Sequence, residues 1–465
     1  MTRTYPHATG QRALVILATI GYAPGASAVT APSVAGIPVE FLLFALTLLG
    51  VALLHRDTLK VAVAGLVTIT LYKLMFTGYA HGTGIAGLGM HLAHEWVTLA
   101  NLLGLLLGFA LLARHFEESR IPALLPNFLP DDWKGSFVLL AMIFLLSSFL
   151  DNIAAAMIGG TISLAVFRGK LHVGYVVAIV AAANAGGAGS VVGDTTTTMM
   201  WIAGVHPLEV FEAYIAAGVA LVVFGIPAAL QQHAWSPMVK DAQPGLRVDW
   251  ARVAVVALIL AAAVLANVIV NTRFAHLSNQ FPFIGIAVWI AILAAAPLRK
   301  PEWALLPSAL KGSMFLISLI LCASMMPIES LPAPSWKTAL GLGFVSAVFD
   351  NIPLTALALK QGGYDWGFLA YAVGFGGSMI WFGSSAGVAL ASIYPQARSV
   401  GLWLRHGWHV AIAYVIGFFV LLLIMGWHPH DKHAPRPAAF GADLAHQTAA
   451  AADQGIRGAT PLFHQ

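Results

Sequence analysis

Long apolar stretches, separated by short polar segments, follow one another along the chain from residue 37 to residue 427. About 20 consecutive apolar residues are enough for an α-helix to cross a bilayer, and continuous rather than alternating apolar runs exclude a transmembrane β-barrel. The pattern therefore predicts an all-α, polytopic membrane protein. The apolar runs fall at residues 37–54, 59–77, 92–113, 135–167, 172–205, 208–230, 252–270, 280–297, 312–326, 335–361, 366–394 and 405–427.

The run 135–167 is too long for a single span and is interrupted near its centre by the pair Asp151-Asn152. Each arm is then about 15 residues long, which is too short to cross the hydrocarbon core alone. Irregular backbone at membrane depth is tolerated only inside the protein or along a cavity. We therefore predict a re-entrant hairpin with the Asp-Asn pair at its tip.

The run 172–205 is also interrupted, by a glycine-rich stretch that begins at Asn184 and ends at Asp194. Glycine weakens a helix, and a polar residue at membrane depth needs partners within the protein. We expect two half-helices joined by an unwound centre.

Both features recur in the second half of the chain. The pair Asp350-Asn351 lies 199 residues after Asp151-Asn152, and a second glycine- and serine-rich break follows at residues 374–387. Internal repeats of a hairpin and a broken helix are typical of secondary transporters. The predicted organisation is a first membrane repeat at 37–230, with hairpin 135–167 and broken helix 172–205, a cytoplasmic linker at 231–251, and a second repeat at 252–427, with hairpin 335–361 and broken helix 366–394.

The two ends differ from this membrane region. Residues 1–28 contain two arginines, a short apolar stretch and an Ala-Ser-Ala triplet, which indicates either a signal peptide or a short N-terminal anchor. Residues 428–465 are rich in Ala, His and Pro with few large apolar groups, which predicts a disordered tail.

Charged residues are scarce and unevenly placed. They make up 9% of the 465 residues against 59% apolar, which excludes a soluble globular protein, and the net charge of +4 gives no reason to expect a nucleic-acid partner. With a mature chain that begins outside, 15 basic residues fall in cytoplasmic loops and only Arg273, Lys337 and Lys360 in outer loops. This positive-inside bias places the two hairpins on opposite sides, so the repeats are predicted to be inverted.

Three carboxylates remain deep in apolar runs, Asp151, Asp194 and Asp350, all at the repeat-related breaks. An ionised carboxylate at membrane depth costs about 2.5–3.5 kcal/mol unless it faces a cavity, an ion or a partner. Aspartate could also serve there as a plain helix cap, but a neutral residue would cap without the charge penalty. We therefore predict that the three aspartates bind a transported ion.

Oxygen-bearing side chains surround these acids, and no Arg or Lys lies at either break. Carboxylate, amide, hydroxyl and backbone carbonyl oxygens suit a hard monovalent cation, so we predict Na⁺ at Asp151, Asp194 and Asp350. A buried carboxylate can instead hold a proton, and competition between the two ions gives antiport. The predicted site comprises Asp151, Asn152, Asn184, Asp194, Thr195, Thr196, Asp350, Asn351, Ser384 and Ser385, with Ser190, Thr197, Thr198, Thr355 and Ser378 nearby.

A second polar group lies near the predicted outer boundary. His91, His94 and Glu95 have the i, i+3, i+4 spacing of one helix face. They could form a metal site, a pH-modulating group or a plain polar helix end.

At the breaks the chain resembles the NhaD-type sodium/proton antiporters of the ion transporter superfamily. The matching stretches are Phe149–Ile153, Ala182–Ala188, Gly193–Trp201, Val348–Leu354, Gly376–Ser378 and Gly383–Val388. The resemblance implies efflux of sodium or lithium driven by inward proton movement, with Asp151, Asn152, Asp194, Thr195, Asp350 and Asn351 in or beside the site.

The resemblance implies a multi-pass protein of the bacterial-type inner membrane, whose partners are the lipid bilayer and monovalent cations. No cofactor is expected beyond the transported ions, and no enzymatic motif is present. Whether two copies form a homodimer is left open. The alternative within the superfamily is a citrate, dicarboxylate or arsenite carrier, which would need a positive partner for its anionic substrate.

Overall fold

Helices account for most of the described residues in the computed structural model, which describes residues 32–54, 57–80, 82–239, 247–274 and 277–429. A short antiparallel hairpin precedes them, with two residues in each strand, β1 (Ser33–Val34) and β2 (Ile37–Pro38). The main helices of the first half are α2 (Val39–Leu53), α3 (Thr58–Tyr72), α4 (Gly84–Glu118), α5 (Ile121–Leu124), α6 (Trp133–Ser147), α7 (Asn152–Val166), α8 (Val173–Ala188), α9 (Thr195–Ile202), α10 (Pro207–Phe211) and α11 (Ala213–Trp235). Those of the second half are α12 (Trp250–Arg273), α13 (Phe283–Ala295), α14 (Leu306–Ser324), α15 (Trp336–Ser346), α16 (Asn351–Gln361), α17 (Trp366–Gly376), α18 (Ser385–Ile393), α19 (Val400–His406) and α20 (Trp408–Met425).

Six helical segments of the described chain are long and apolar enough to cross a membrane. They are Thr58–Thr77, Gly84–Glu118, Pro207–Trp235, Trp250–Val270, Trp303–Ser324 and Trp408–Met425. The prediction of an all-α, polytopic membrane protein is confirmed. The predicted signal peptide or anchor at 1–28 and nearly all of the predicted tail lie outside the described residues.

Helix ends lie at the interruptions in the two long apolar runs. Helix α6 ends at Ser147 and α7 begins at Asn152, while α8 ends at Ala188 and α9 begins at Thr195. Helices α6 and α7 contain 15 residues each. At 1.5 Å per residue each reaches about 22 Å, less than the hydrocarbon core of about 30 Å. Helices α6 and α7 pack against each other, as the arms of a hairpin do.

Two boundaries differ from the sequence prediction. Helix α4 begins at Gly84, eight residues before the predicted run, because glycines and a histidine lower the hydropathy of its first turns without preventing a helix. Helix α11 continues to Trp235, so the first residues of the predicted linker 231–251 are helical.

The short second helix of each broken pair packs on the hairpin of the other half. Helix α9 of the first half packs on α16 of the second, and α18 of the second half packs on α7 of the first. Reciprocal packing of this kind fits a repeat, whereas the inverted orientation of the repeats stays a prediction.

Glycines at matching positions allow close helix contacts in both halves. A β-carbon at Gly186 would overlap the backbone oxygen of Phe144, and one at Gly376 would overlap the backbone of Gly343. These glycines lie 190 residues apart (186 to 376), and each brings a broken helix against the first arm of its own hairpin. Small residues let helix backbones approach closely in membranes.

Replacing Gly186 with alanine is expected to force α6 away from α8 and to destabilise the protein by about 1–3 kcal/mol, the usual effect of overpacking. The thermal unfolding midpoint of the purified protein in detergent measures this change. Gly218→Ala is the control, because no atom lies within 4 Å of the added carbon. Equal midpoints for the two variants would contradict the tight crossing.

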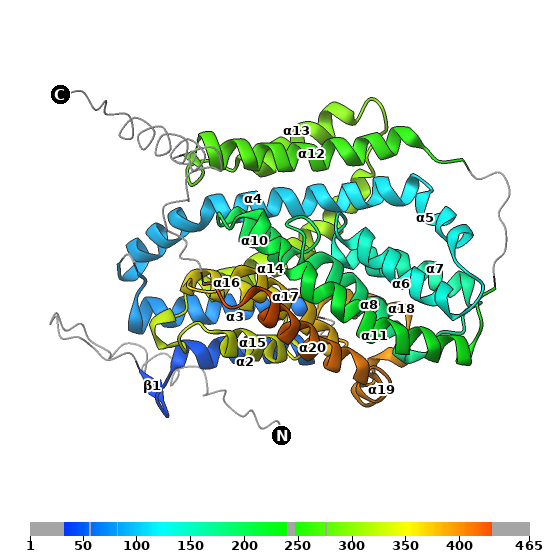
Figure 1. Cartoon of the computed structure of the whole chain (residues 1–465). Helices are drawn as coiled ribbons and strands as arrows, with labels where there is room; N and C mark the ends of the chain where they lie inside the picture. The colour runs from blue at the N-terminus through cyan, green and yellow to red at the C-terminus, as the bar shows by residue number, and fades with distance from the viewer. Residues whose placement is uncertain (1–31, 55–56, 81, 240–246, 275–276, 430–465) are drawn as a thin grey trace, which may run out of the picture.

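Helices α12 and α13 form a separate layer. They pack against each other and against α4, and they lie together at one edge of the molecule (Figure 1). Arg252 in the first turn of α12 forms an ion pair with Glu118 of α4, and Arg299 after α13 forms one with Asp249 before α12.

Candidate functional site

Four helix N-termini are joined by polar side chains in the protein interior. Helices α7, α9 and α16 are preceded by Asp151, Asp194 and Asp350, and α18 is preceded by Ser384. A free helix N-terminus carries roughly half a positive charge and unpaired N–H groups. The side chains before these helices therefore determine how much of that positive charge is neutralised before an ion binds.

Asp194 is the most enclosed of the three carboxylates, with 2% of its surface exposed. Its Oδ1 accepts from the backbone N–H of Thr196 at 3.1 Å, and the Thr196 hydroxyl lies beside it. Its Oδ2 accepts from Nδ2 of Asn152 at 3.2 Å. Asp194 therefore caps α9 with one oxygen and faces the tip of the first hairpin with the other.

Asn184 links this group to the second half of the chain. Its Oδ1 accepts from Asn152 Nδ2 at 3.1 Å, and its Nδ2 donates to Ser378 Oγ at 2.9 Å and to Ser384 Oγ at 3.0 Å. The side chains of Asn184 and Ser378 are completely buried. Ser384 Oγ also accepts from the N–H of Gly387, which caps α18.

Asp350 and Asp151 are only partly buried. Asp350 Oδ1 accepts from the N–H of Ile352 at 3.0 Å, and its Oδ2 accepts from Ser385 Oγ at 3.3 Å. The carboxylate of Asp151 lies near the first N–H groups of α7 but without the geometry of a capping hydrogen bond. Both carboxylates lie near enough to Asp194 to interact with it electrostatically.

The two halves of this site are not equivalent. Gly187 lies close to Gly193 in the first break, and Gly377 lies equally close to Gly383 in the second, so these glycines correspond at a spacing of 190 residues (187 to 377 and 193 to 383). The same spacing pairs Asn184 with Gly374, which has no side chain.

The missing amide at position 374 explains an unsatisfied group in the second half. Asn351 corresponds to Asn152, yet its buried Nδ2 has no hydrogen-bond partner within the described residues. In the first half, Asn152 donates to the side chain of Asn184, but the corresponding residue Gly374 has no side chain to accept a hydrogen bond from Asn351. The Ser384 hydroxyl already accepts from Asn184. The Oδ2 of Asp194 instead lies 3.6 Å from where a β-carbon at Gly374 would stand.

Most of the predicted site residues meet in this network, and some do not. Thr195 begins α9 but takes no part in the network of the described residues. The hydroxyls of Thr197 and Thr198 donate to backbone oxygens of Ser190 and Val191, so these threonines hold the unwound segment. Gly374 begins the predicted second break but is not among the predicted site residues, although the 190-residue spacing of the two breaks pairs it with Asn184.

The carboxylates do not gather around one point. Across the part of the chain that the structure describes, no three His, Cys, Asp or Glu side chains are close enough to share a metal ion. A cation ligated jointly by Asp151, Asp194 and Asp350 therefore does not fit this arrangement. An ion held by one carboxylate together with amide, hydroxyl and backbone oxygens does.

The group at His91, His94 and Glu95 is not a metal site in this structure. His91 is buried, its Nε2 lies 2.9 Å from Ser324 Oγ, and its ring stacks on Tyr79. His94 is exposed, so the two histidines do not converge. A pH-modulating role for these residues stays a prediction.

Two buried carboxyl groups were not predicted. Glu40 in the first turn of α2 is 1% exposed, and Asp365 before α17 is 4% exposed. Asp365 accepts from the N–H groups of Phe368 and His428, so it caps a helix away from the breaks. Both acids lie at the ends of apolar runs, where sequence does not distinguish a solvated loop from a buried cap.

The chain matches several curated antiporters. It is 28% identical over 285 residues to sodium/proton antiporter 1 of Arabidopsis thaliana, over 53% of this chain and 48% of that protein. It is 28% identical to sodium/proton antiporter 2 of the same plant, over 54% of this chain and 67% of that protein. It is 25% identical to the Na⁺/H⁺ antiporter NhaD of Alkalimonas amylolytica, over 61% of this chain and 67% of that protein.

The chain is related to the NhaD-type sodium/proton antiporters. The resemblance found at the breaks is thereby confirmed, although no family model matches the chain. The aligned stretch spans about half of the first plant antiporter and about two thirds of the NhaD relative. None of these three relatives carries the name of a citrate or arsenite carrier.

Proposed function

We propose that this protein is a secondary active transporter, not an enzyme, that exchanges cytoplasmic Na⁺ or Li⁺ for external H⁺ by alternating access. Asp194 is the residue that carries the proposal, since it is the most enclosed carboxylate and it joins both halves through Asn152 and Asn184. The relatives' names support the same exchange. The transported ions are the cargo, and the proposal includes no cofactor.

The charge of the site favours a cation. Four helix N-termini contribute roughly two positive charges in total, and three ionised aspartates contribute three negative charges. A net charge of about −1 attracts one monovalent cation, and a proton on one carboxylate neutralises it equally well. Competition between Na⁺ and H⁺ for Asp194 then couples the two movements.

The same arrangement counts against an anionic substrate. A citrate or arsenite carrier would use free helix N-termini or a basic side chain to hold the anion. Here Asp194 and Asp350 occupy two of the N-termini and Ser384 occupies a third. Of the four, only the N-terminus of α7 lacks a capping hydrogen bond, and the carboxylate of Asp151 lies beside it, so the described residues of the site offer an anion no free positive partner.

Alternating access requires an element that moves past a fixed partner. We assign this movement to the hairpin and broken-helix pairs, since each half packs its short half-helix on the other half. A multi-pass location in a bacterial-type inner membrane follows the NhaD relatives, and a homodimer is compatible with the proposal but not required by it.

Everted membrane vesicles with a pH-sensitive dye test the function. After an inward proton gradient is formed, addition of sodium or lithium is expected to dissipate it, and potassium is not. A response restricted to citrate or arsenite would overturn the proposal. Vesicles without the protein are the control.

Neutralising Asp350 or Asp151 with asparagine is expected to raise the apparent KM for sodium about 5-fold, or to shift the pH profile of exchange. Both carboxylates place negative charge near Asp194, and each therefore attracts a cation bound there. Losing about 1 kcal/mol of this attraction corresponds to an affinity for sodium that is about 5-fold weaker. The vesicle assay over a range of sodium concentrations and pH values measures both quantities. An unchanged KM and pH profile in both variants would reduce these aspartates to plain helix caps.

A further inference from the structure

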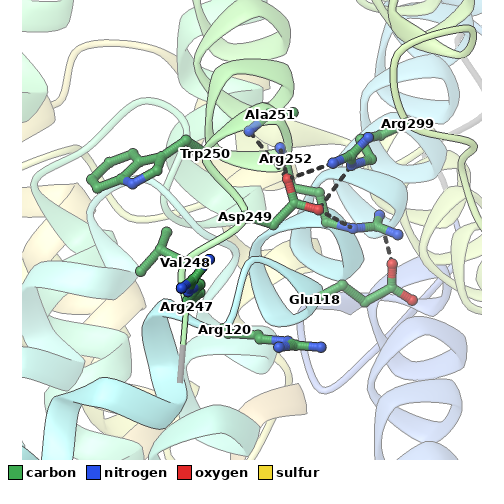
Figure 2. Close-up of a pocket in the computed structure, with 9 residues that line it drawn as sticks. All are labelled: Glu118, Arg120, Arg247, Val248, Asp249, Trp250, Ala251, Arg252 and Arg299. Carbon is green, nitrogen blue, oxygen red and sulfur yellow. Dashed lines mark hydrogen bonds and ion pairs between the residues drawn. The ribbon is translucent and has the colours of Figure 1, made fainter. Parts of the chain in front are cut away.

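A second polar feature lies where α4 and α13 end and α12 begins. A pocket of about 800 Å³ opens there between the end of α4, the segment before α12 and Arg299 after α13 (Figure 2). The ion-exchange proposal makes no use of this pocket.

The pocket lies at the ends of two helices that are long and apolar enough to cross a membrane. The apolar span of α4 ends at Glu118 and that of α12 begins at Trp250, and both residues line the pocket. Trp250 is 70% exposed. An exposed tryptophan at the end of a span is typical of the membrane–water boundary, where lipid headgroups lie.

Part of the charge in the pocket is already paired. Asp249 accepts from Nε of Arg299 at 2.8 Å and from its Nη2 at 3.2 Å, and Arg252 lies 2.5 Å from Glu118 (Figure 2). The hydrogen bonds from Arg299 hold the pKa of Asp249 below its usual value, so this carboxylate is ionised at neutral pH. These pairs fix the walls of the pocket.

Arg120 and Arg247 supply charge that is not paired. Both line the pocket and are exposed, and among the residues that the structure describes neither forms an ion pair. Arg120 is held in a left-handed backbone conformation, with φ of 67°, directly after the end of α4. The pocket therefore has four guanidinium groups against two carboxylates, an excess of two positive charges.

We infer that this pocket binds the headgroup phosphate of an anionic phospholipid, with Arg120 and Arg247 contacting the phosphate. Guanidinium groups bind phosphate oxygens through paired hydrogen bonds, and anionic lipids are enriched where basic residues meet the cytoplasmic leaflet. The predicted topology places all four arginines on the cytoplasmic side.

The surface beside the pocket favours a lipid over free phosphate. Leu258 and Leu265 on α12 and Leu298 after α13 are 46%, 58% and 54% exposed. Trp250 lines the pocket and Leu258 and Leu265 follow it along α12, so exposed apolar side chains extend from the pocket along an apolar helix. A lipid bound there would contact α4, α12 and α13 at once and would hold the outer layer to the rest of the molecule.

Native mass spectrometry of the purified full-length protein in non-ionic detergent tests the inference. Phosphatidylglycerol, phosphatidylcholine and inorganic phosphate are titrated separately. The double variant Arg120→Gln/Arg247→Gln is expected to bind phosphatidylglycerol about 30-fold more weakly, since each arginine near an anionic lipid is worth about 5-fold in affinity. The single variant Arg247→Gln, with a loss of about 5-fold, provides the measurement if the double variant fails to fold.

Lys311→Gln/Arg405→Gln is the matched control, because it removes two exposed basic residues of the same predicted side outside the pocket. Unchanged affinity in this control supports the assignment. Equal weakening in the control, equal affinity of the wild-type protein for the two lipids, or phosphate binding with the same dependence on Arg120 and Arg247 would each overturn it.

Discussion

Replacing Asp194 with asparagine is expected to abolish sodium/proton exchange, with a loss of at least about 100-fold. Asparagine retains the shape of the side chain and can still cap α9, so the protein should insert and fold normally. It removes the charge that balances the cation, and an uncompensated ion in a low-dielectric site costs about 3–5 kcal/mol. The everted-vesicle assay, normalised to the amount of protein in the membrane, measures the loss.

Asp365→Asn is the matched control. Asp365 is also a buried aspartate at a helix N-terminus, but it caps α17 through Phe368 instead of joining the network at the breaks. Exchange is expected to stay within about twofold of the wild type in this variant. Near-normal exchange in Asp194→Asn, or equal loss in both variants, would show that Asp194 is not the ion-binding residue.

Replacing Asn184 with alanine is expected to reduce exchange about 10- to 100-fold. The change leaves the Ser378 hydroxyl without its donor, leaves Ser384 only the N–H of Gly387, and leaves Asn152 bonded only to Asp194. Each buried polar group without a partner costs about 1–3 kcal/mol. Initial rates over a range of sodium concentrations measure the effect on both KM and maximal rate.

Ser378→Ala tests whether the effect of Asn184→Ala comes from the whole amide or from a single hydrogen bond. This variant removes one acceptor of Asn184 and keeps the bond to Ser384, so its loss should be clearly smaller than that of Asn184→Ala. An equal loss in the two variants would mean that the link between the halves does not depend on the Asn184 amide as a whole.

The breaks in the helices could be predicted from sequence because polar residues within apolar runs are conspicuous. The pairs Asp151-Asn152 and Asp350-Asn351 mark the starts of α7 and α16 in the structure. Local composition and hydropathy decide such features, and both are read directly along the chain.

The partners within the site could not be predicted in the same way. Asn184 bonds to Ser384, which lies 200 residues further along the chain, and hydropathy does not indicate which polar residue meets which. The burial of Glu40 and Asp365 was missed for a related reason, since tertiary packing covers the ends of apolar runs. The topology of the two halves relative to the membrane stays a prediction from the basic residues.

The one-sided amide at Asn184 has an energetic consequence for a carrier with two facing states. If the halves exchange roles during transport, strictly identical repeats would make the two states equally populated. Asn184 donates two hydrogen bonds to the second half, while its counterpart Gly374 can donate none. At about 1 kcal/mol per bond, this difference alone would favour the present conformation about 30-fold, so the empty carrier would rest facing one side of the membrane.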